Sequence, residues 1–447
     1  MTAPGQFVFD PNRCTGCEAC VLACWMENRA QQTQPWRRVY SFNGPKHPGL
    51  PVFQLSLACH HCDHPACLEQ CPAGAYARDA ATGAVVLDSG RCMGCRYCTW
   101  VCPHDAPRYA GALGTVEKCT FCQSRQAAGL EPACVARCPV AALGFEPRDP
   151  AGRGALPRGF PESALGPAIR IAAPQRPGPE LTAPPEPAAL GRHWGSLLRI
   201  PESKITLRGE WTLVVFTATL AVLVAVLAAH AAATPLRASW PLQGGFLGAG
   251  LAALALSTSH LGRPFRAWRA LTNLRHSWVS REIALVSAFL GLAGLQLLWF
   301  PAHRPLAWAA VAVGFLALWA VDRVYQVALH TGALNFHSAQ ALFTGLYLAG
   351  ILAGSVPLAL AAGALKAVLY GHRKLHFRRQ GRAGTPLLSL LRLALGFAGP
   401  ALAFGTGLGA LSAVLGELLD RCEFYRELEL PTPARALAQA LARIHPA

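Results

Sequence analysis

The hydrophobic pattern of this chain changes in character about midway along the sequence. From Trp211 to about Leu419 the residues are mostly Leu, Ala and Gly in long uncharged runs. Runs of about 17 to 23 apolar residues are long enough to cross a hydrocarbon core of roughly 30 Å as helices. Before about residue 150 the apolar stretches are short, and cysteines separate them. The pattern predicts a membrane domain in the second half and a different kind of domain in the first.

Six apolar stretches predict the membrane helices. Two of them are long, with 33 residues at Ser338–Tyr370 and 34 at Pro386–Leu419. At 1.5 Å per residue, the first would give a helix of about 50 Å, which is too long for one crossing. We therefore expect two hairpins, broken near Ser355 and Pro357 and around Phe404–Gly409. The single spans are expected at Trp211–Ala233, Leu242–Leu261, Ile283–Phe300 and Pro305–Val321, which makes eight helices in all.

The basic residues follow this membrane pattern. The net charge is +16, but the arginines flank apolar spans and are not gathered on one soluble module with interleaved aromatics, so nucleic-acid binding is not expected. With eight spans and the amino terminus inside, outside loops carry only Arg237 and Arg304. Six spans would place the five basic residues of 373–382 outside. The bias favours a multi-pass inner-membrane protein with both termini and the cysteine domain on the cytoplasmic side.

Sixteen of the seventeen cysteines lie in four groups of four between Cys14 and Cys138. Each group begins with C-x-x-C and ends with a cysteine four residues after the third. The residues before Cys14 contain no basic or apolar segment, so no secretory signal is expected, and cluster or metal ligation is favoured over disulfides. The groups are Cys14, Cys17, Cys20, Cys24; Cys59, Cys62, Cys67, Cys71; Cys92, Cys95, Cys98, Cys102; and Cys119, Cys122, Cys134, Cys138.

This spacing predicts four [4Fe-4S] clusters, with the sixteen cysteines as iron ligands. In C-x-x-C-x-x-C, three thiolates surround one cluster and a fourth, followed by proline, reaches the neighbouring cluster. The first and third groups have this spacing, and Pro103 follows Cys102. Zinc is the alternative, but zinc ribbons do not need runs of three evenly spaced cysteines. A three-iron cluster in one group is a further alternative, although every position retains its cysteine.

The segments between the cysteines predict the domain organisation. Short strands run into cysteine loops, as at Leu50–Cys59, and indicate an α+β, duplicated ferredoxin-like four-cluster domain over residues 1–176. Ala168–Pro174 is expected to pack back on that domain. A Pro-rich linker follows at 177–206. An all-α bundle of eight transmembrane helices is expected at 207–430, and a cytoplasmic tail at 431–447.

The cysteine domain resembles a known family. Residues 7 to about 176, with C-T-G-C-E-A-C, C-H-H-C-D-H-P-A-C, C-M-G-C-R-Y-C-T-W-V-C-P-H-D-A-P-R-Y and E-K-C-T-F-C, are similar to the four-cluster subunits of molybdopterin oxidoreductases, particularly the DMSO reductase iron-sulfur subunit. The resemblance implies ligands shared between groups. The implied sets are Cys14, Cys17, Cys20, Cys138; Cys24, Cys119, Cys122, Cys134; Cys59, Cys62, Cys67, Cys102; and Cys71, Cys92, Cys95, Cys98.

Two ionisable residues at helix ends are the candidate quinone site. His260 ends the second expected span and Glu282 begins the third, both on the inside face. An imidazole and a carboxylate there could hydrogen-bond a quinol and take its protons. The alternative is that His260 caps a helix and that Glu282 pairs with Arg281. Residues 205 to about 430 resemble the DMSO reductase anchor, whose quinol site is associated with the histidine of H-L-G and the glutamate of S-W-L-S-R-E. The stretch 324–336 departs from that family.

Other residues carry weaker signals. His60, His61 and His64 could tune a cluster through hydrogen bonds, but surface positions are the alternative. Lys118 could raise a potential, and an ordinary solvated lysine is the favoured alternative. A haem b would need two facing histidines, which His230, His330 and His337 do not suggest. Cys422 is expected to be a buried thiol and not a ligand.

Together these observations predict a redox subunit without a molybdenum catalytic site. The chain is expected to move electrons between menaquinone or ubiquinone and a separate molybdopterin catalytic subunit, in the direction of quinol oxidation. Quinone reduction with a sulfite dehydrogenase-type partner is the alternative direction. Two alternatives from other classes are a zinc-stabilised, non-redox anchor and an ion-translocating module, for which Lys366 and Arg392 are the candidate residues within spans.

Overall fold

The computed structural model describes residues 4–29, 33–42, 53–148, 164–172, 203–232, 240–329, 335–379, 385–430, 432, 433 and 435. The chain divides into two compact units. One contains the described residues up to Lys204 together with those from Leu430 onward, and the other is Ile205–Glu429. The predicted linker at 177–206 lies largely outside the described residues.

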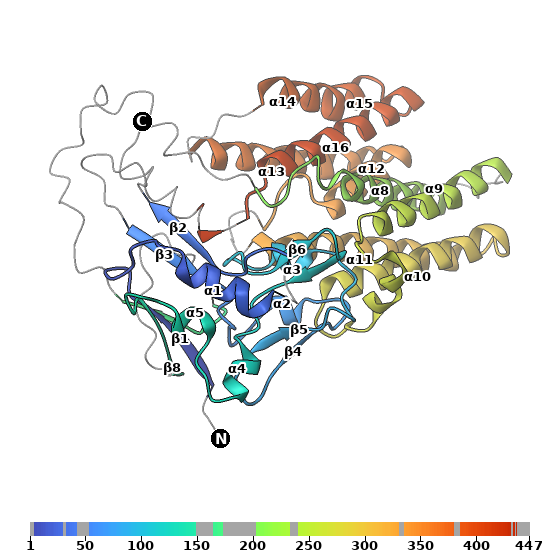
Figure 1. The fold of residues 1–447 in the computed structure, drawn as a ribbon. Coiled ribbons are helices and arrows are strands. Elements are labelled where there is room, and N and C mark those ends of the chain that lie inside the picture. Colours follow the sequence, from blue (N-terminus) through green and yellow to red (C-terminus); the bar gives the residue numbers. More distant parts are fainter. Residues whose placement is uncertain are drawn as a thin grey trace, which may run out of the picture. The chain divides into compact units, whose positions relative to one another are not determined.

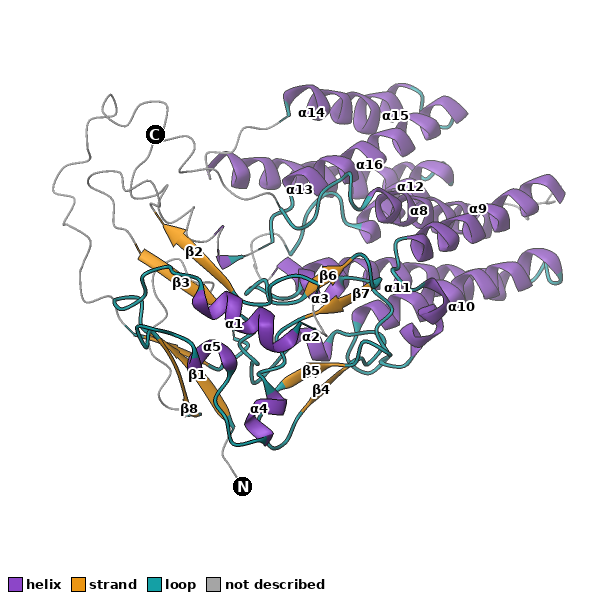
Figure 2. Cartoon of the chain, in the orientation of Figure 1, coloured by secondary structure: helices purple, strands orange, loops and turns teal. Residues whose placement is uncertain are grey.

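The first unit is built on a small sheet and three hairpins (Figure 2). In the sheet, β1 pairs antiparallel with β8 and parallel with β9, in the order β8-β1-β9. The hairpins are β2–β3, β4–β5 and β6–β7. The strands are β1 (Gly5–Phe9), β2 (Arg38–Phe42), β3 (Phe53–Leu57), β4 (Tyr76–Arg78), β5 (Val85–Leu87), β6 (Arg108–Ala110), β7 (Thr115–Glu117), β8 (Leu143–Pro147) and β9 (Ile169–Ile171).

Strand β3 lies in the stretch Leu50–Cys59, where the sequence predicts a strand, and β1 and β5 also precede cysteine loops. The expectation that the segment after Ala168 packs back is confirmed by β9, whose Ile169 and Ile171 pair with Phe7 and Phe9. Short helices lie between these strands, and four of them carry five of the sixteen cysteines. The helices are α1 (Ala19–Asn28), α2 (Ala66–Glu69), α3 (Tyr97–Trp100), α4 (Gln123–Ala127) and α5 (Ala133–Ala136).

The second unit is helical, and its helices run side by side in Figure 1. Helix α8 is central because it packs on α9, α11, α12 and α16. The elements are α8 (Trp211–Ala232), α9 (Trp240–Ser259), the 3-10 helix η2 (Pro264–Leu271), α10 (Trp278–Leu298), α11 (Arg304–Leu329), α12 (Ala341–Leu352), α13 (Val356–Arg379), α14 (Pro386–Leu393), the π-helix η4 (Ala394–Ala398), α15 (Gly399–Leu402) and α16 (Gly407–Glu427).

The breaks expected in the two long apolar stretches are confirmed. Helix α12 ends at Leu352 and α13 begins at Val356, with Gly354 between them in a left-handed conformation at φ 64°. Glycine adopts that conformation without the penalty of a Cβ atom. The second break separates α15 from α16, since α15 ends at Leu402.

The number of membrane crossings stays a prediction. Among the described residues, three helices (α8, α10 and α11) are long and apolar enough to cross a membrane, and a bent pair, Gln243–Ser259 with Pro264–Leu271 at 104°, would make a fourth. Helices α13 and α16 have 24 and 21 residues, but both carry several charged side chains. Those charges lower their hydropathy and pair with one another.

Candidate functional site

Three of the four cysteine sets line their own small cavities in the first unit. In each case cysteines that are distant in sequence meet: Cys138 joins the first group, Cys102 joins the second, and Cys71 joins the third. We call these sets cradles. Cradle A is Cys14, Cys17, Cys20 and Cys138; cradle C is Cys59, Cys62, Cys67 and Cys102; cradle D is Cys71, Cys92, Cys95 and Cys98.

The remaining cysteines, Cys24, Cys119, Cys122 and Cys134, form cradle B. The charges of Cys134 and Cys122 act on Cys24, and those of Cys24 and Cys122 act on Cys119, so the four thiols are neighbours. Backbone N–H groups also face the sulfurs, as in the bond from Phe121 N to Cys119 Sγ at 3.3 Å. The structure thus brings together the same sets that the resemblance implies.

The first and third cysteine loops share one backbone conformation. Gly16 and Gly94 occupy the same place in C-x-x-C and both have φ 73°. Two residues later, Glu18 and Arg96 have φ 59° and 60°. Residues other than glycine rarely adopt positive φ, so the repeated sequence spacing produces a repeated, tightly wrapped loop. Such a loop points three successive cysteines to one side.

The donor set fits iron-sulfur clusters. None of the seventeen cysteines, all of which the structure describes, forms a disulfide. Burial raises the pKa of Cys24 to about 12 and that of Cys95 to about 12, so these thiolates require a compensating positive charge such as iron. Among the described residues, no three His, Cys, Asp or Glu side chains converge on a point where a single ion could bind. In a cubane each thiolate binds its own iron, whereas zinc draws its sulfur ligands to about 2.3 Å from one centre.

Two of the three candidate tuning histidines are buried at cradle C. His60 and His61 are each 1% exposed, so the surface alternative is wrong for them, whereas His64 is exposed. The His60 ring lies 4.4 Å from the ring of His104, and the His61 ring stacks on Phe121 at 4.1 Å. Burial lowers the pKa of both His60 and His61 well below the usual range, and both remain neutral.

Lys118 is also buried, at 3% exposure, so the solvated-lysine alternative is wrong. Its Nζ donates to the carbonyl oxygens of Val85 and Cys119. A second buried cation, Arg37, is 1% exposed and was not marked by any sequence motif. Arg37 directly precedes strand β2 in the sequence, and only the folded chain brings it close to cysteines of the first and fourth groups.

The two residues of the candidate quinone site lie at either end of one connection in the second unit. His260 is half-buried in the turn after α9, and Glu282 is half-buried in the first turns of α10. The alternative partner for Glu282 is not observed, because Arg281 donates to the carbonyl oxygens of Leu274 and Arg275 and stacks on Trp278. The charges that act on Glu282 are those of Arg421 and Asp322.

A buried set of ion pairs joins α13 and α14 to α16. Acidic side chains recur on α16 every three or four residues and meet cations from the other helices. Arg373 contacts Asp420 at 2.8 Å and Glu423 at 3.3 Å, while Arg392 contacts Glu417 at 3.2 Å. The prediction that Lys366 and Arg392 are the ionisable candidates within spans was incomplete. The sequence signal for the acidic residues of α16 was their spacing in G-E-L-L-D-R-C-E-F-Y, residues 416–425, since positions three and four apart share a helix face.

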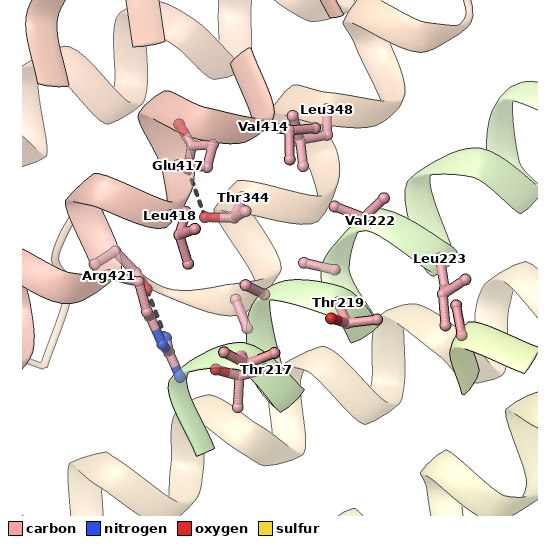
Figure 3. Close-up of a pocket in the computed structure, with 16 residues that line it drawn as sticks. Thr217, Thr219, Val222, Leu223, Thr344, Leu348, Val414, Glu417, Leu418 and Arg421 are labelled. Atoms are coloured by element: carbon pink, nitrogen blue, oxygen red, sulfur yellow. Dashed lines mark hydrogen bonds between the residues drawn. The ribbon is translucent and has the colours of Figure 1, made fainter. Parts of the chain in front are cut away.

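A cavity of about 320 Å³ lies between α8, α9, α12 and α16 (Figure 3). Its walls are mostly apolar, with Val222, Leu348 and Val414 among them. Polar groups gather at one part of the lining, where Thr344 donates to Glu417 at 2.7 Å and Arg421 donates to the carbonyl of Ala339 at 2.6 Å. This volume falls within the range of about 300 to 1,000 Å³ typical of small-molecule sites. Sequence reasoning missed this cavity.

The histidines considered for haem contact different residues. His230 is buried beside Gln296, with 3.4 Å between their Nε2 atoms. His337 stacks on Phe424, with ring centres 4.1 Å apart. His330 lies outside the described residues. Cys422 is half-buried on α16, so it is less enclosed than expected.

Comparisons with known proteins match both halves of the chain. Residues 51–148 match the 4Fe-4S dicluster domain, and residues 209–370 match the DMSO reductase anchor subunit (DmsC). The probable anaerobic dimethyl sulfoxide reductase chain YnfG of Escherichia coli (strain K12) is 41% identical over 155 residues, which are 33% of this chain and 75% of that protein. The thiosulfate reductase electron transfer subunit PhsB of Salmonella typhi is 39% identical over 149 residues, which are 32% of this chain and 77% of that protein.

The cysteine cradles and the helical unit define an iron-sulfur electron-transfer protein with a membrane anchor. The chain belongs to the DMSO reductase family, in which it fuses the iron-sulfur subunit and the anchor subunit in one polypeptide.

Proposed function

We propose that this chain moves electrons between the membrane quinone pool and a separate molybdopterin catalytic subunit, in the direction of quinol oxidation. The observation that carries the proposal is the convergence of sixteen cysteines in four cradles on a chain that also contains an anchor domain. When bound, one [4Fe-4S] cluster per cradle would supply the one-electron carriers between quinol and partner. Relatives among the reductases of sulfur compounds, of which one is named for DMSO and one for thiosulfate, support such a partner.

The quinol is proposed to bind near His260 and Glu282. Both groups can hydrogen-bond a hydroxyl and accept a proton, which is what oxidation of a quinol requires of the protein. Arg421 supports this location because its charge acts on Glu282 and its side chain also lines the apolar cavity. The ring would lie near the ionisable groups, while the apolar walls would accommodate an isoprenoid chain.

The metal content tests the proposal directly. The chain is purified anaerobically together with its co-purifying large subunit, and iron, zinc and molybdenum are measured. Four cubanes give about sixteen irons per chain. Zinc in place of iron, with no iron-sulfur EPR signal on reduction, would establish the non-redox anchor instead. Reduction of the clusters by added menaquinol, and the absence of reoxidation by added menaquinone, would support the direction.

Substitutions test the quinone site. H260N and E282Q should each slow reduction of the clusters by menaquinol by about 10²-fold or more, the usual contribution of a positioned acid or base. H276N is the matched control, since His276 is exposed in the same connection. Full iron content in all three variants shows that the cradles are intact. Equal rates for H260N, E282Q and H276N would place the quinol elsewhere.

We further propose that the cysteine domain, over residues 1–176, faces the cytoplasm, and that the anchor, over residues 207–430, crosses the inner membrane eight times. The distribution of basic residues supports this orientation. Of two reporters fused after Gly5, the one that is active only in the cytoplasm should show activity, and the one that is active only in the periplasm should not. Activity of a periplasm-dependent reporter at that position would reverse the orientation and favour an exported catalytic partner.

A further inference from the structure

Arg37 and Lys118 lie at the junctions between neighbouring cradles. Each is almost completely buried, at 1% and 3% exposure. The charge of each also acts on cysteines of two different cradles. This position is distinct from that of an ordinary surface cation, whose effect on a buried site is weakened by water.

Arg37 joins cradle A to cradle B. On the side of cradle A, its Nη1 donates to Ser56 Oγ at 3.1 Å, and that hydroxyl lies 3.3 Å from Cys20 Sγ. On the side of cradle B, its backbone N–H hydrogen-bonds Cys24 and its side chain hydrogen-bonds Cys134. The guanidinium is held in place by the ring of Phe7, at 4.8 Å from the ring centre.

Lys118 joins cradle B to cradle C. Its Nζ donates to the carbonyl oxygen of Cys119, a cradle B residue, at 2.9 Å. The same ammonium hydrogen-bonds Cys59, and its charge acts on both Cys59 and Cys67 of cradle C.

Neither cation is neutralised by a carboxylate in the part of the chain that the structure describes. Lys204 provides the contrast. It donates to the carbonyl oxygen of Cys102 at 3.0 Å, but its ammonium also pairs with Asp105 at 3.1 Å. The charge of Lys204 is therefore compensated beside cradle C, while those of Arg37 and Lys118 act on the cysteines in full.

We propose that the positive charges of Arg37 and Lys118 raise the reduction potentials of the clusters on either side of each residue. Reduction adds one electron to a cluster, and a fixed positive charge in a low-dielectric interior stabilises the added negative charge. Arg37 acts on the clusters of cradles A and B, and Lys118 on those of cradles B and C. Cradle D has neither cation beside it. The inference rests on the proposed four-cluster function.

The test is an EPR-monitored redox titration of the full chain in membranes. R37Q should shift the potentials of clusters A and B to more negative values, and K118M those of clusters B and C, while cluster D keeps its potential in both. R37K and K118R retain the charge and should stay close to the parent. R13Q removes a cation next to Cys14 that is exposed, and it should leave all four unchanged. Single Cys→Ser variants in each cradle assign the four signals.

Several results would overturn the proposal. Unchanged potentials in R37Q and K118M, an equal shift of all four clusters, or a shift of the same size in R13Q would each do so. If R37Q or K118M loses iron, the D105N variant tests the electrostatic mechanism instead. This substitution removes the carboxylate that compensates Lys204 beside Cys102, so it should shift only cluster C to a more positive potential. No shift in D105N would then reject the electrostatic mechanism. The proposed function is tested separately, in the parent chain. About sixteen irons per chain and reduction of the clusters by menaquinol would support it whatever the potentials of the variants.

Discussion

Lys366 of α13 and Glu417 of α16 form an ion pair of 2.7 Å with both side chains buried. Glu417 also accepts from Thr344, and Lys366 also donates to the carbonyl of Ser338. Glu417 pairs with both Lys366 and Arg392, so removing Lys366 takes away its nearer cation and leaves a buried negative charge with less compensation, which is destabilising. This relationship makes the interior of the anchor sensitive to single charge changes.

K366M should therefore destabilise the anchor, by less than the about 3–5 kcal/mol of a fully uncompensated buried charge, because Arg392 still pairs with Glu417. The measurement is the thermal midpoint of the purified chain in detergent. R378M is the control, because Arg378 lies on the same helix but is exposed. The double variant K366M/E417Q should recover part of the loss, since both members of the pair are then neutral and Arg392 still pairs with Asp420 at 3.3 Å. A K366M midpoint equal to that of R378M would show that the pair does not hold α13 to α16. Altered proton flux in vesicles would instead favour the ion-translocating alternative.

G416A should destabilise the packing of α16 on the π-helix η4. A Cβ atom at Gly416 would lie 2.2 Å from Gly396 Cα and 2.3 Å from Gly396 N, and backbone atoms cannot move aside as a flexible side chain can. Close approach through small residues is a common way for membrane helices to pack. We expect a loss of about 1–3 kcal/mol, the usual cost of overpacking.

The control for G416A is G291A on α10. A Cβ atom at Gly291 meets nothing within 4 Å, and alanine is the better helix former. G291A should therefore unfold at the same temperature as the parent or slightly higher. Equal midpoints for G416A and G291A would mean that η4 and α16 are not in close contact in the membrane.

Cysteines of one cradle should behave as a unit although they are far apart in sequence. C14S and C138S should perturb the same EPR signal, and C122S a different one, because Cys14 and Cys138 share a cavity. Each loss should lower the iron content by about four per chain, or by about one if a three-iron cluster remains. C422S should leave the iron content unchanged. Different signals lost in C14S and C138S would contradict the ligand sets proposed from the cradles.

The ion pair of Glu146 and Arg170 should make a small, pH-dependent contribution to the β8-β1-β9 sheet. Glu146 accepts from Arg170 at 2.9 and 3.0 Å and from Gln6 at 2.8 Å. The bond from Arg170 lowers the pKa of Glu146 below its ordinary value. Because the folded pKa is the lower one, the contribution is present above the unfolded pKa and is lost as the pH falls through the folded pKa.

E146Q should therefore lower the thermal midpoint slightly near pH 7, and the difference from the parent should vanish in acid. Both side chains are about a third exposed or more, so we expect less than about 1 kcal/mol. Thermal unfolding at several pH values, followed by circular dichroism, measures it. A difference that persists unchanged below the folded pKa would assign the effect to packing rather than to charge.

Much of the fold could be read from local pattern. The strands before the cysteine loops, the return of the segment at Ile169–Ile171 and the breaks at Gly354 and before α16 follow from short apolar runs that lead into cysteine loops, from turn residues and from run length. These signals are local, because each depends on residues within one element or at its end. Bounds were less accurate: α11 continues to Leu329 and α13 to Arg379, past the last apolar residues expected.

What the sequence by itself determined is the chemistry: sixteen cysteines in repeated spacing, and apolar runs long enough for a membrane domain. Only the tertiary structure decided which charged residues lie beside the cysteines and beside the candidate quinone site. Lys118 is indistinguishable from a solvated lysine in the sequence, and Arg37 carries no motif, yet both are buried between cradles. The charge of Arg421 acts on Glu282, which lies 139 positions away in the sequence. Such partnerships depend on how distant segments pack, and the burial that results is what gives a single charge its strength.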